Sequence, residues 1–128
     1  RRERGYLLVL GLDNLKWVNL RAGREAGDRM LSKVGGILGQ EAAGCGVYRI
    51  GGDWFGLLLT RTDRAEAEAL FERVRARLRG ACTLSGGCVS YTDFHVDGPQ
   101  TLLQYAETAL YAAKEGGKDR LALFTPED

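Results

Sequence analysis

The chain has 128 residues, of which 45% are apolar and 27% charged, proportions typical of a globular domain. Its formal net charge is +1, which gives no electrostatic basis for binding a nucleic-acid backbone or a membrane surface. Three cysteines without C-x-x-C spacing favour a reducing, cytoplasmic compartment. We expect a single domain over residues 1–128. Because it begins at Arg1 without methionine, we also expect it to be a fragment of a larger multidomain protein.

The first half of the chain predicts a strand, a helix and a hairpin. The continuous apolar run Tyr6–Leu12 predicts a strand that is buried on both faces. Apolar residues at four-residue spacing predict a helix over Glu25–Leu38. The apolar runs Cys45–Ile50 and Trp54–Leu59 predict a β-hairpin that turns at Gly51-Gly52, where glycine tolerates positive φ values.

The second half predicts two helices and two strands. Thr62-Asp63 offers an N-cap for a helix whose apolar face is Ala67, Leu70, Phe71, Val74 and Leu78. A strand follows over Cys82–Tyr91, and Asp97-Gly98-Pro99 opens a helix that Gly116-Gly117 ends. Leu121–Phe124 is the last predicted strand. The order β-α-β-β-α-β-α-β predicts the mixed α+β class: a ferredoxin-like βαββαβ core, a central, mostly antiparallel sheet with helices packed on it, plus an extra helix and edge strand.

The segment Gly51-Gly52-Asp53-Trp54-Phe55 resembles the GGDEF signature of diguanylate cyclases, which condense two GTP molecules into cyclic di-GMP. The resemblance extends over residues 6–124. It includes blocks similar to the family's D-x-D-x-F-K-x-x-N, G-x-x-x-G-D, S-I-G and A-L-Y-x-A-K-x-x-G-[RK]-N-R patterns, here Leu12–Asn19, Gly23–Asp28, Leu84–Cys88 and Ala109–Arg120. The resemblance implies the palm fold of the nucleotidyl cyclases.

The resemblance also implies three acidic positions that hold catalytic magnesium. Here they are Gly11, Asp53 and Trp54, so Asp53 is the one remnant catalytic acid and only a weak, partial metal ligand. Asp13 lies two residues beyond Gly11, roughly 6–7 Å along the strand, too far to replace the lost ligand without rearrangement. We expect Asp13 to cap the following helix instead. No cofactor is expected to be required, and Mg²⁺ is expected only if the domain is active.

In the family, an Asn and an Asp bind the guanine edge and basic residues contact the phosphates. The matching residues are Asn19 and Asp28 for guanine, and Lys16, Lys114 and Lys118 for phosphate. The plainer alternatives are that Asp28 supports a helix start and that each lysine is an exposed charge.

The family's feedback-inhibition site is expected to be absent, because its charged R-x-x-D positions are Ala42 and Cys45 here. His95 lies in a polar loop and is expected to be structural or to face solvent, and Trp17 is expected to pack against the domain, with contact to a partner as the alternative.

Three functions remain open. The favoured one is a degenerate, catalytically inactive GGDEF domain that serves as a regulatory or GTP-binding interaction module in a bacterial signalling protein. The others are an active cyclase and a dimerisation scaffold that binds no nucleotide. Gly11 and Trp54 separate the first from the second, whereas Asn19, Asp28 and Lys114 separate it from the third. The expected partners are therefore GTP and either another protein or a second copy.

Overall fold

A five-stranded sheet forms the centre of the computed structural model, which describes residues 5–50, 53–91 and 98–124. Across these residues the strand order is β2-β3-β1-β4-β5. The bounds of the strands are β1 Gly5–Leu12, β2 Gly46–Ile50, β3 Trp54–Thr60, β4 Leu84–Ser90 and β5 Leu121–Leu123. Neighbouring strands are antiparallel except β4 and β5, which are parallel. The predicted mixed, mostly antiparallel architecture is confirmed.

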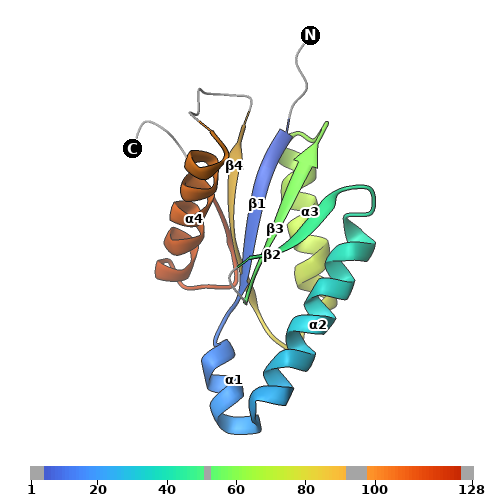
Figure 1. Ribbon diagram of the computed structural model, residues 1–128, viewed down its shortest axis with the longest axis vertical. Coiled ribbons are helices and arrows are strands. Elements are labelled where there is room, and N and C mark those ends of the chain that lie inside the picture. The colour runs from blue at the N-terminus through green and yellow to red at the C-terminus, as the bar shows by residue number, and fades with distance from the viewer. Residues whose placement is uncertain (1–4, 51–52, 92–97, 125–128) are drawn as a thin grey trace.

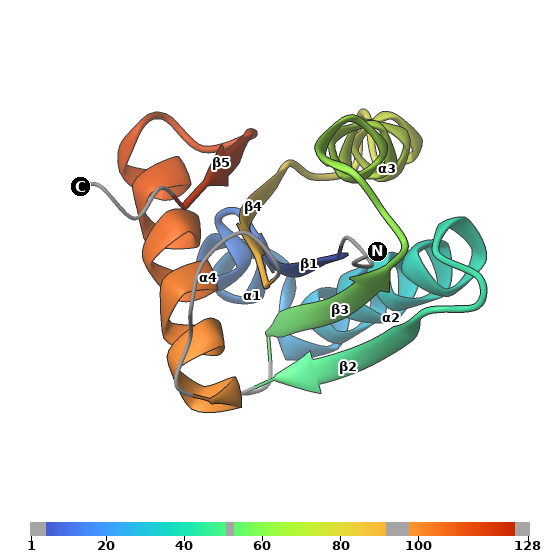
Figure 2. The same ribbon diagram turned by 90° about the horizontal axis from the view of Figure 1, so that it is seen from above.

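Helices cover both faces of the sheet (Figures 1 and 2). Their bounds are α1 Leu15–Ala22, α2 Arg24–Glu41, α3 Arg64–Arg77 and α4 Pro99–Glu115. Successive side chains of β1 point to opposite faces of the sheet and so belong to different hydrophobic clusters. Leu8 and Leu10 join the large core beneath α2 and α3, whereas Val9 joins a smaller cluster with Ala106 and Leu110 of α4.

Local sequence signals explain where α3 and α4 begin and how α4 packs. Asp63 and Glu66 form a reciprocal capping box at the start of α3. Pro99 supplies the pre-set φ of a first helical residue in α4. Gly87 of β4 lets α4 lie directly on the sheet, because a Cβ there would collide with the backbone of Ala106 and Leu110. This close contact positions the polar residues at the end of α4.

The short helix α1 was not predicted from the sequence. It has no buried residue, so it lacks the apolar periodicity on which the prediction rests. Asn14 enters it with a left-handed φ of 64°, and Gly23 separates it from α2 with a φ of 91°. The expectation that Trp17 packs against the domain is wrong, because its side chain is 57% exposed. No helix in the described part of the chain is long and apolar enough to cross a membrane.

Candidate functional site

A cavity of about 570 Å³, here called the α2 cavity, opens between α1, the first turns of α2 and the β2–β3 hairpin. Asn19 of α1, Asp28 of α2, Arg49 of β2 and Asp53 contribute to its wall. The remaining lining residues are Leu15, Arg24 and Leu31. The structure thus brings Asp53, which follows the β2 strand, to the same cavity as Asn19 and Asp28. A cavity of this volume lies within the range of small-molecule sites.

The Asn19 side chain places a buried polar atom behind the wall of the α2 cavity. Its Oδ1 is buried and has no hydrogen-bond partner among the described residues. Gly27 permits this packing, because a Cβ there would collide with that oxygen. A buried acceptor without a donor costs free energy, so such atoms are rare in folded proteins. Asn19 thus belongs to the cavity wall, while its Oδ1 is packed against α2 at Gly27 and hidden from solvent.

The two replaced acidic positions, Gly11 and Trp54, lie directly opposite each other on β1 and β3. A Cβ built on Gly11 would lie 3.6 Å from Cδ1 of Trp54 and 3.6 Å from Nζ of Lys114. The indole is half-buried and packs against the cluster that includes Leu110 of α4. Trp54 therefore points towards α4, whereas the neighbouring Asp53 lines the α2 cavity. Indole and ammonium together occupy the surroundings of the missing first-strand acid.

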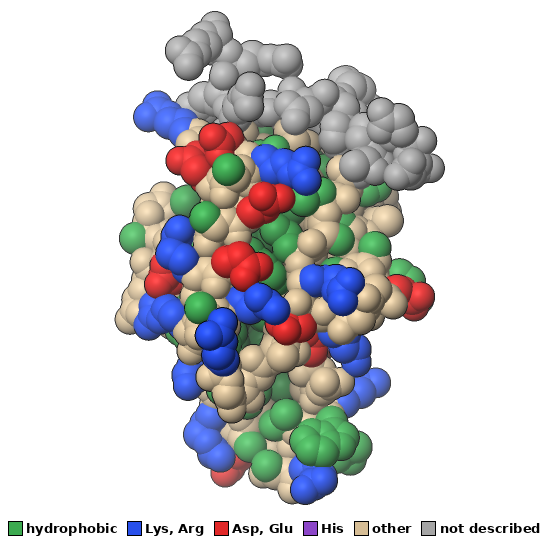
Figure 3. All heavy atoms as spheres, turned by 180° about the vertical axis from the view of Figure 1, so that it is seen from behind, with side chains coloured by type: hydrophobic (Ala, Val, Ile, Leu, Met, Phe, Trp, Pro, Cys, Tyr) green, Lys and Arg blue, Asp and Glu red, His purple; other side chains and the backbone are tan. Residues whose placement is uncertain are grey.

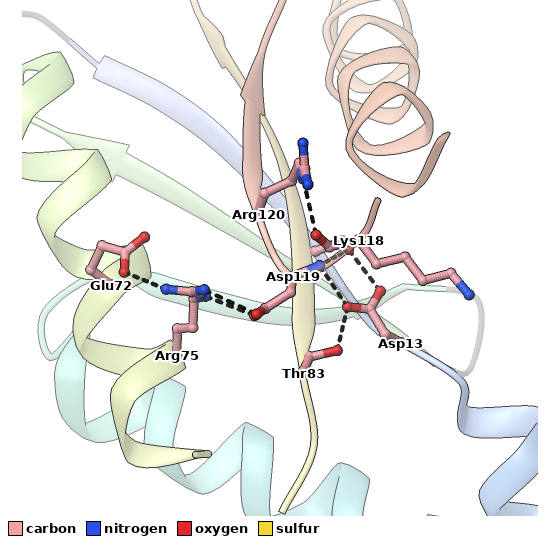
Figure 4. A network of polar contacts seen from close by, with 8 residues as sticks. Asp13, Glu72, Arg75, Thr83, Lys118, Asp119 and Arg120 are labelled. Atoms are coloured by element: carbon pink, nitrogen blue, oxygen red, sulfur yellow. Dashed lines mark hydrogen bonds and ion pairs between the residues drawn. The ribbon is translucent and has the colours of Figure 1, made fainter. Parts of the chain in front are cut away.

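Asp13 anchors a polar network between β1, β4 and the loop after α4 (Figure 4). Its carboxylate accepts hydrogen bonds from Thr83 Oγ1 and Ser85 Oγ, both at 2.7 Å, from Lys114 Nζ at 2.9 Å and from the Asp119 N–H at 3.0 Å. Burial opposes ionisation, but the hydrogen bonds from Ser85, Lys114, Thr83 and Asp119 outweigh it and hold the pKa of Asp13 below its usual range.

The expected capping role of Asp13 is wrong. The N-cap residue of α1 is Asn14, and no side chain there accepts a capping hydrogen bond. Asp13 instead has a side chain that is 0% exposed and committed to partners on β4 and α4. The sequence indicates that Asp13 follows the first strand. It does not indicate the partners of Asp13, because they lie about seventy to one hundred residues later in the chain.

The lysines matched to phosphate contacts are not in the α2 cavity. Lys114 Nζ donates to Asp13 Oδ1 and, at 3.3 Å, to the Leu12 carbonyl. Lys118 Nζ donates to Asn14 Oδ1 at 2.9 Å, and Lys16 is exposed on α1. Two arginines, Arg24 and Arg49, line the cavity instead. Sequence reasoning did not assign Arg24 to the site, and its only signal is its position four residues before Asp28.

A second ion pair holds the loop after α4 from the other side (Figure 4). Arg75 of α3 donates from Nε and Nη2 to the two carboxylate oxygens of Asp119 at 2.7 and 2.9 Å. This hydrogen-bonded pair lowers the pKa of Asp119 and raises that of Arg75. The backbone N–H of Asp119 meanwhile donates to Asp13, so the loop joins α3 to the end of β1.

The model of the family described as "Diguanylate cyclase, GGDEF domain" matches residues 1–120 of the chain. The chain belongs to the GGDEF domain family. Sequence relatives agree: the Escherichia coli K12 protein named cyclic di-GMP phosphodiesterase PdeR is 33% identical over 130 residues, which cover 94% of this chain and 20% of PdeR. The chain thus spans about a fifth of that curated relative.

Solved GGDEF structures share the fold. The GGDEF domain of YfiN (TpbB) from Pseudomonas aeruginosa superposes with a TM-score of 0.90 at 27% identity, over 98% of this chain and 84% of that one. Diguanylate cyclase SiaD of Pseudomonas aeruginosa, in a complex with its activator SiaC, gives a TM-score of 0.83 at 27% identity, over 94% of this chain and 50% of that one. The palm-type fold expected from the sequence is therefore established.

Some GGDEF features fall on residues that the structure leaves undescribed. The signature glycines Gly51 and Gly52 lie outside the described residues, as does the loop that holds His95. The flanking strands β2 and β3 do pair as a hairpin, with Ile50 opposite Trp54.

Proposed function

We propose that this chain is a catalytically inactive GGDEF domain that binds GTP without converting it, and acts as a regulatory or interaction module of a cytoplasmic bacterial signalling protein. The observation that carries the proposal is the pairing of Gly11 with Trp54, beside a cavity that keeps Asn19, Asp28 and Asp53. In this proposal the side chains that recognise the nucleotide differ from those that hold the catalytic metal. Nucleotide binding can therefore persist when catalysis is lost.

The residues present do not fit a catalytic magnesium site. Joining a 3′-hydroxyl to an α-phosphate needs metal ions that neutralise developing charge, and magnesium takes oxygen ligands. The described residues contain no group of three metal-ligating side chains. The position of the first-strand acid is glycine, and the nearest charged group there is the Lys114 ammonium. A cation at that place disfavours a second cation, and an indole supplies no oxygen.

The α2 cavity offers groups that suit a guanine nucleotide. The carboxylate of Asp28 is an acceptor for paired N–H donors such as those on the guanine edge, and the Asn19 amide belongs to the same cavity wall. Arg24 and Arg49 bring guanidinium groups, which pair well with phosphate oxygens. The acceptors and the cations in one cavity support binding of a purine triphosphate.

The relatives support a role through partners. PdeR carries a matching region within a protein named for breaking down cyclic di-GMP, so membership of the family does not by itself imply synthesis. SiaD is a cyclase crystallised with its protein activator. An inactive domain that retains a nucleotide site could act in the same way: nucleotide binding would change its interaction with another domain or protein.

A long incubation with GTP and magnesium, followed by chromatography, tests the absence of synthesis. We expect no cyclic di-GMP from the purified chain, since loss of a catalytic metal removes several kcal/mol of transition-state stabilisation. Product that forms in proportion to the protein added, and disappears in Asp53→Ala, would show that the domain is an active cyclase.

A further inference from the structure

The outward face of α1 exposes two large apolar side chains side by side. Trp17 is 57% exposed and Leu20 is 86% exposed. Their spacing of three residues places them on the same side of the helix, and Arg21 joins them, its guanidinium carbon lying 4.7 Å from the centre of the Trp17 ring. We call Trp17, Leu20 and Arg21 the α1 face. Tryptophan and arginine are the residue types enriched among the strongest contacts of protein interfaces.

The charged side chains of α1 itself are all basic, and the first acids, Glu25 and Asp28, follow on α2. Residues 14–24 hold three basic side chains, Lys16, Arg21 and Arg24, and no acidic one. The whole chain, by contrast, is nearly balanced, with 18 basic and 17 acidic residues. Figure 3 shows hydrophobic side chains gathered at the foot of the molecule, the end at which Figure 1 draws α1, with Lys and Arg side chains beside them.

Nothing within the described part of the domain buries this face. α1 has no buried residue, and its main packing partner is α2. A helix of eight residues is too short to be stable by itself, so it is α2 that holds it in place. The neighbouring domain core therefore does not need Trp17 or Leu20, and leaving both in water forgoes the free energy of their burial.

From this combination we infer that the α1 face is a docking surface for an acidic amphipathic segment of a protein partner. Large apolar side chains of the segment would cover Trp17 and Leu20, and its carboxylates would pair with Arg21 and Lys16. The inference rests on the interaction role proposed above, but not on whether the domain binds a nucleotide.

A lipid surface fits the same side chains less well. The exposed acids Glu25 and Asp28 follow within two turns on α2, where an anionic bilayer would repel them. An eight-residue helix is only about 12 Å long, which offers little area for insertion. A narrow protein segment can contact α1 without reaching those acids.

Fluorescence anisotropy with a dye-labelled synthetic peptide tests the docking surface. The probe is a helical peptide of about 18 residues with Leu at i, i+3, i+4 and i+7 and Glu on its flanks, and its partner probe has Lys for every Glu. We expect the acidic peptide to bind the 128-residue chain and the basic peptide to bind at least about tenfold more weakly. The double variant Trp17→Ala, Leu20→Ser should weaken binding of the acidic peptide about tenfold or more, and Arg21→Gln about threefold.

Tyr48→Ser is the matched control, because Tyr48 lies on β2 and is 59% exposed, nearly the same as Trp17. It should leave peptide binding unchanged. Failure of the acidic peptide to bind, or equal binding by the double variant, would overturn the inference. Loss of binding in the double variant to phosphatidylglycerol vesicles, or loss of a dimer in sedimentation velocity, without peptide binding would assign the surface to lipid or to a second copy and also overturn it. Calorimetry of the same variants with GTP keeps this outcome separate from the nucleotide proposal.

Discussion

Asp53 and Trp54 are neighbours in sequence, yet they belong to two regions of the molecule: a polar cavity and an apolar cluster on α4. Asp53 lines the α2 cavity, with Asn19 and its unpartnered buried oxygen, whereas Trp54 packs over Gly11 against α4. Successive residues of a strand point to opposite faces, so a substitution at one leaves the environment of the other almost untouched. A substitution can therefore remove the catalytic acid from one face of this hairpin while the recognition groups on the other face remain.

The largest effect is expected at Asp13, whose network holds the end of β1 beside both regions. Asp13→Asn leaves the Lys114 ammonium partly buried without its counter-charge, and should lower the free energy of unfolding by about 3 kcal/mol. Urea denaturation measures this. The control is Glu68→Gln, which breaks an exposed ion pair with Arg64 and should cost less than about 0.5 kcal/mol. Equal losses in the two variants would show that the Asp13 network contributes little.

The same network predicts a pH dependence. The pKa of Asp13 is lower in the folded chain than in the unfolded one, so its contribution is complete above about pH 4 and is lost as the pH falls towards the folded value. Unfolding measured between neutral and acidic pH should therefore show a shallower acid-induced loss of stability in Asp13→Asn than in the parent. Parallel stability curves for the two proteins would contradict the lowered pKa.

The next largest effect is expected for Trp54→Ala, which should change stability without changing GTP binding. Removing a half-buried indole from the cluster on α4 should cost about 2 kcal/mol and lower the melting midpoint by several degrees. GTP affinity should not change, because Trp54 does not line the α2 cavity. The exposed Tyr48 provides the control, since Tyr48→Ala should leave the midpoint within about a degree. An unchanged midpoint for Trp54→Ala would rule out the packing role of Trp54. A loss of GTP affinity would show that Trp54 also contributes to nucleotide binding.

Asn19→Ala is expected to change GTP affinity without lowering stability. Removing the Asn19 amide from the cavity wall should weaken GTP binding about tenfold, the worth of roughly one hydrogen bond, while stability stays the same or rises because the unpartnered acceptor is gone. Calorimetric titration and thermal melting give the two values. Lys16→Gln is the control, because Lys16 does not line the cavity and should change affinity little. A larger loss with Lys16→Gln than with Asn19→Ala would favour the phosphate contact implied by the resemblance.

The smallest effect is expected from restoring the acids. Gly11→Asp with Trp54→Glu places two carboxylates on directly opposite positions of neighbouring strands, about 5 Å apart at their Cβ atoms. The double variant should gain weak Mn²⁺ binding before any activity, because Lys114 lies beside the new site and competes for the carboxylates. Electron paramagnetic resonance of added Mn²⁺ measures this. Each single variant should gain little, and no gain in the double variant would contradict the alignment of Gly11 with the family's first acid.

The sequence predicted the sheet, its hairpin and three of the helices, because their apolar periodicity is regular and their ends carry Pro, Gly or capping residues. It missed α1, which buries nothing and so has no periodic signal. It identified Asn19, Asp28 and Asp53 by their place in motifs, and these do share one cavity. It did not predict the partners of Asp13 and Lys114, since their pairing depends on how α4 lies on β4 at Gly87 rather than on any local pattern.

Isothermal titration of the chain with GTP, with and without magnesium, measures whether the domain binds nucleotide independently of a metal. We expect one binding site of similar affinity in both conditions, because the proposed contacts are to the base and to arginines and no metal site is left to couple to binding. Absence of binding in both conditions would indicate a scaffold without nucleotide. Binding that appears only with magnesium would contradict the proposed loss of the metal site at Gly11 and Trp54, because such binding requires a bound metal.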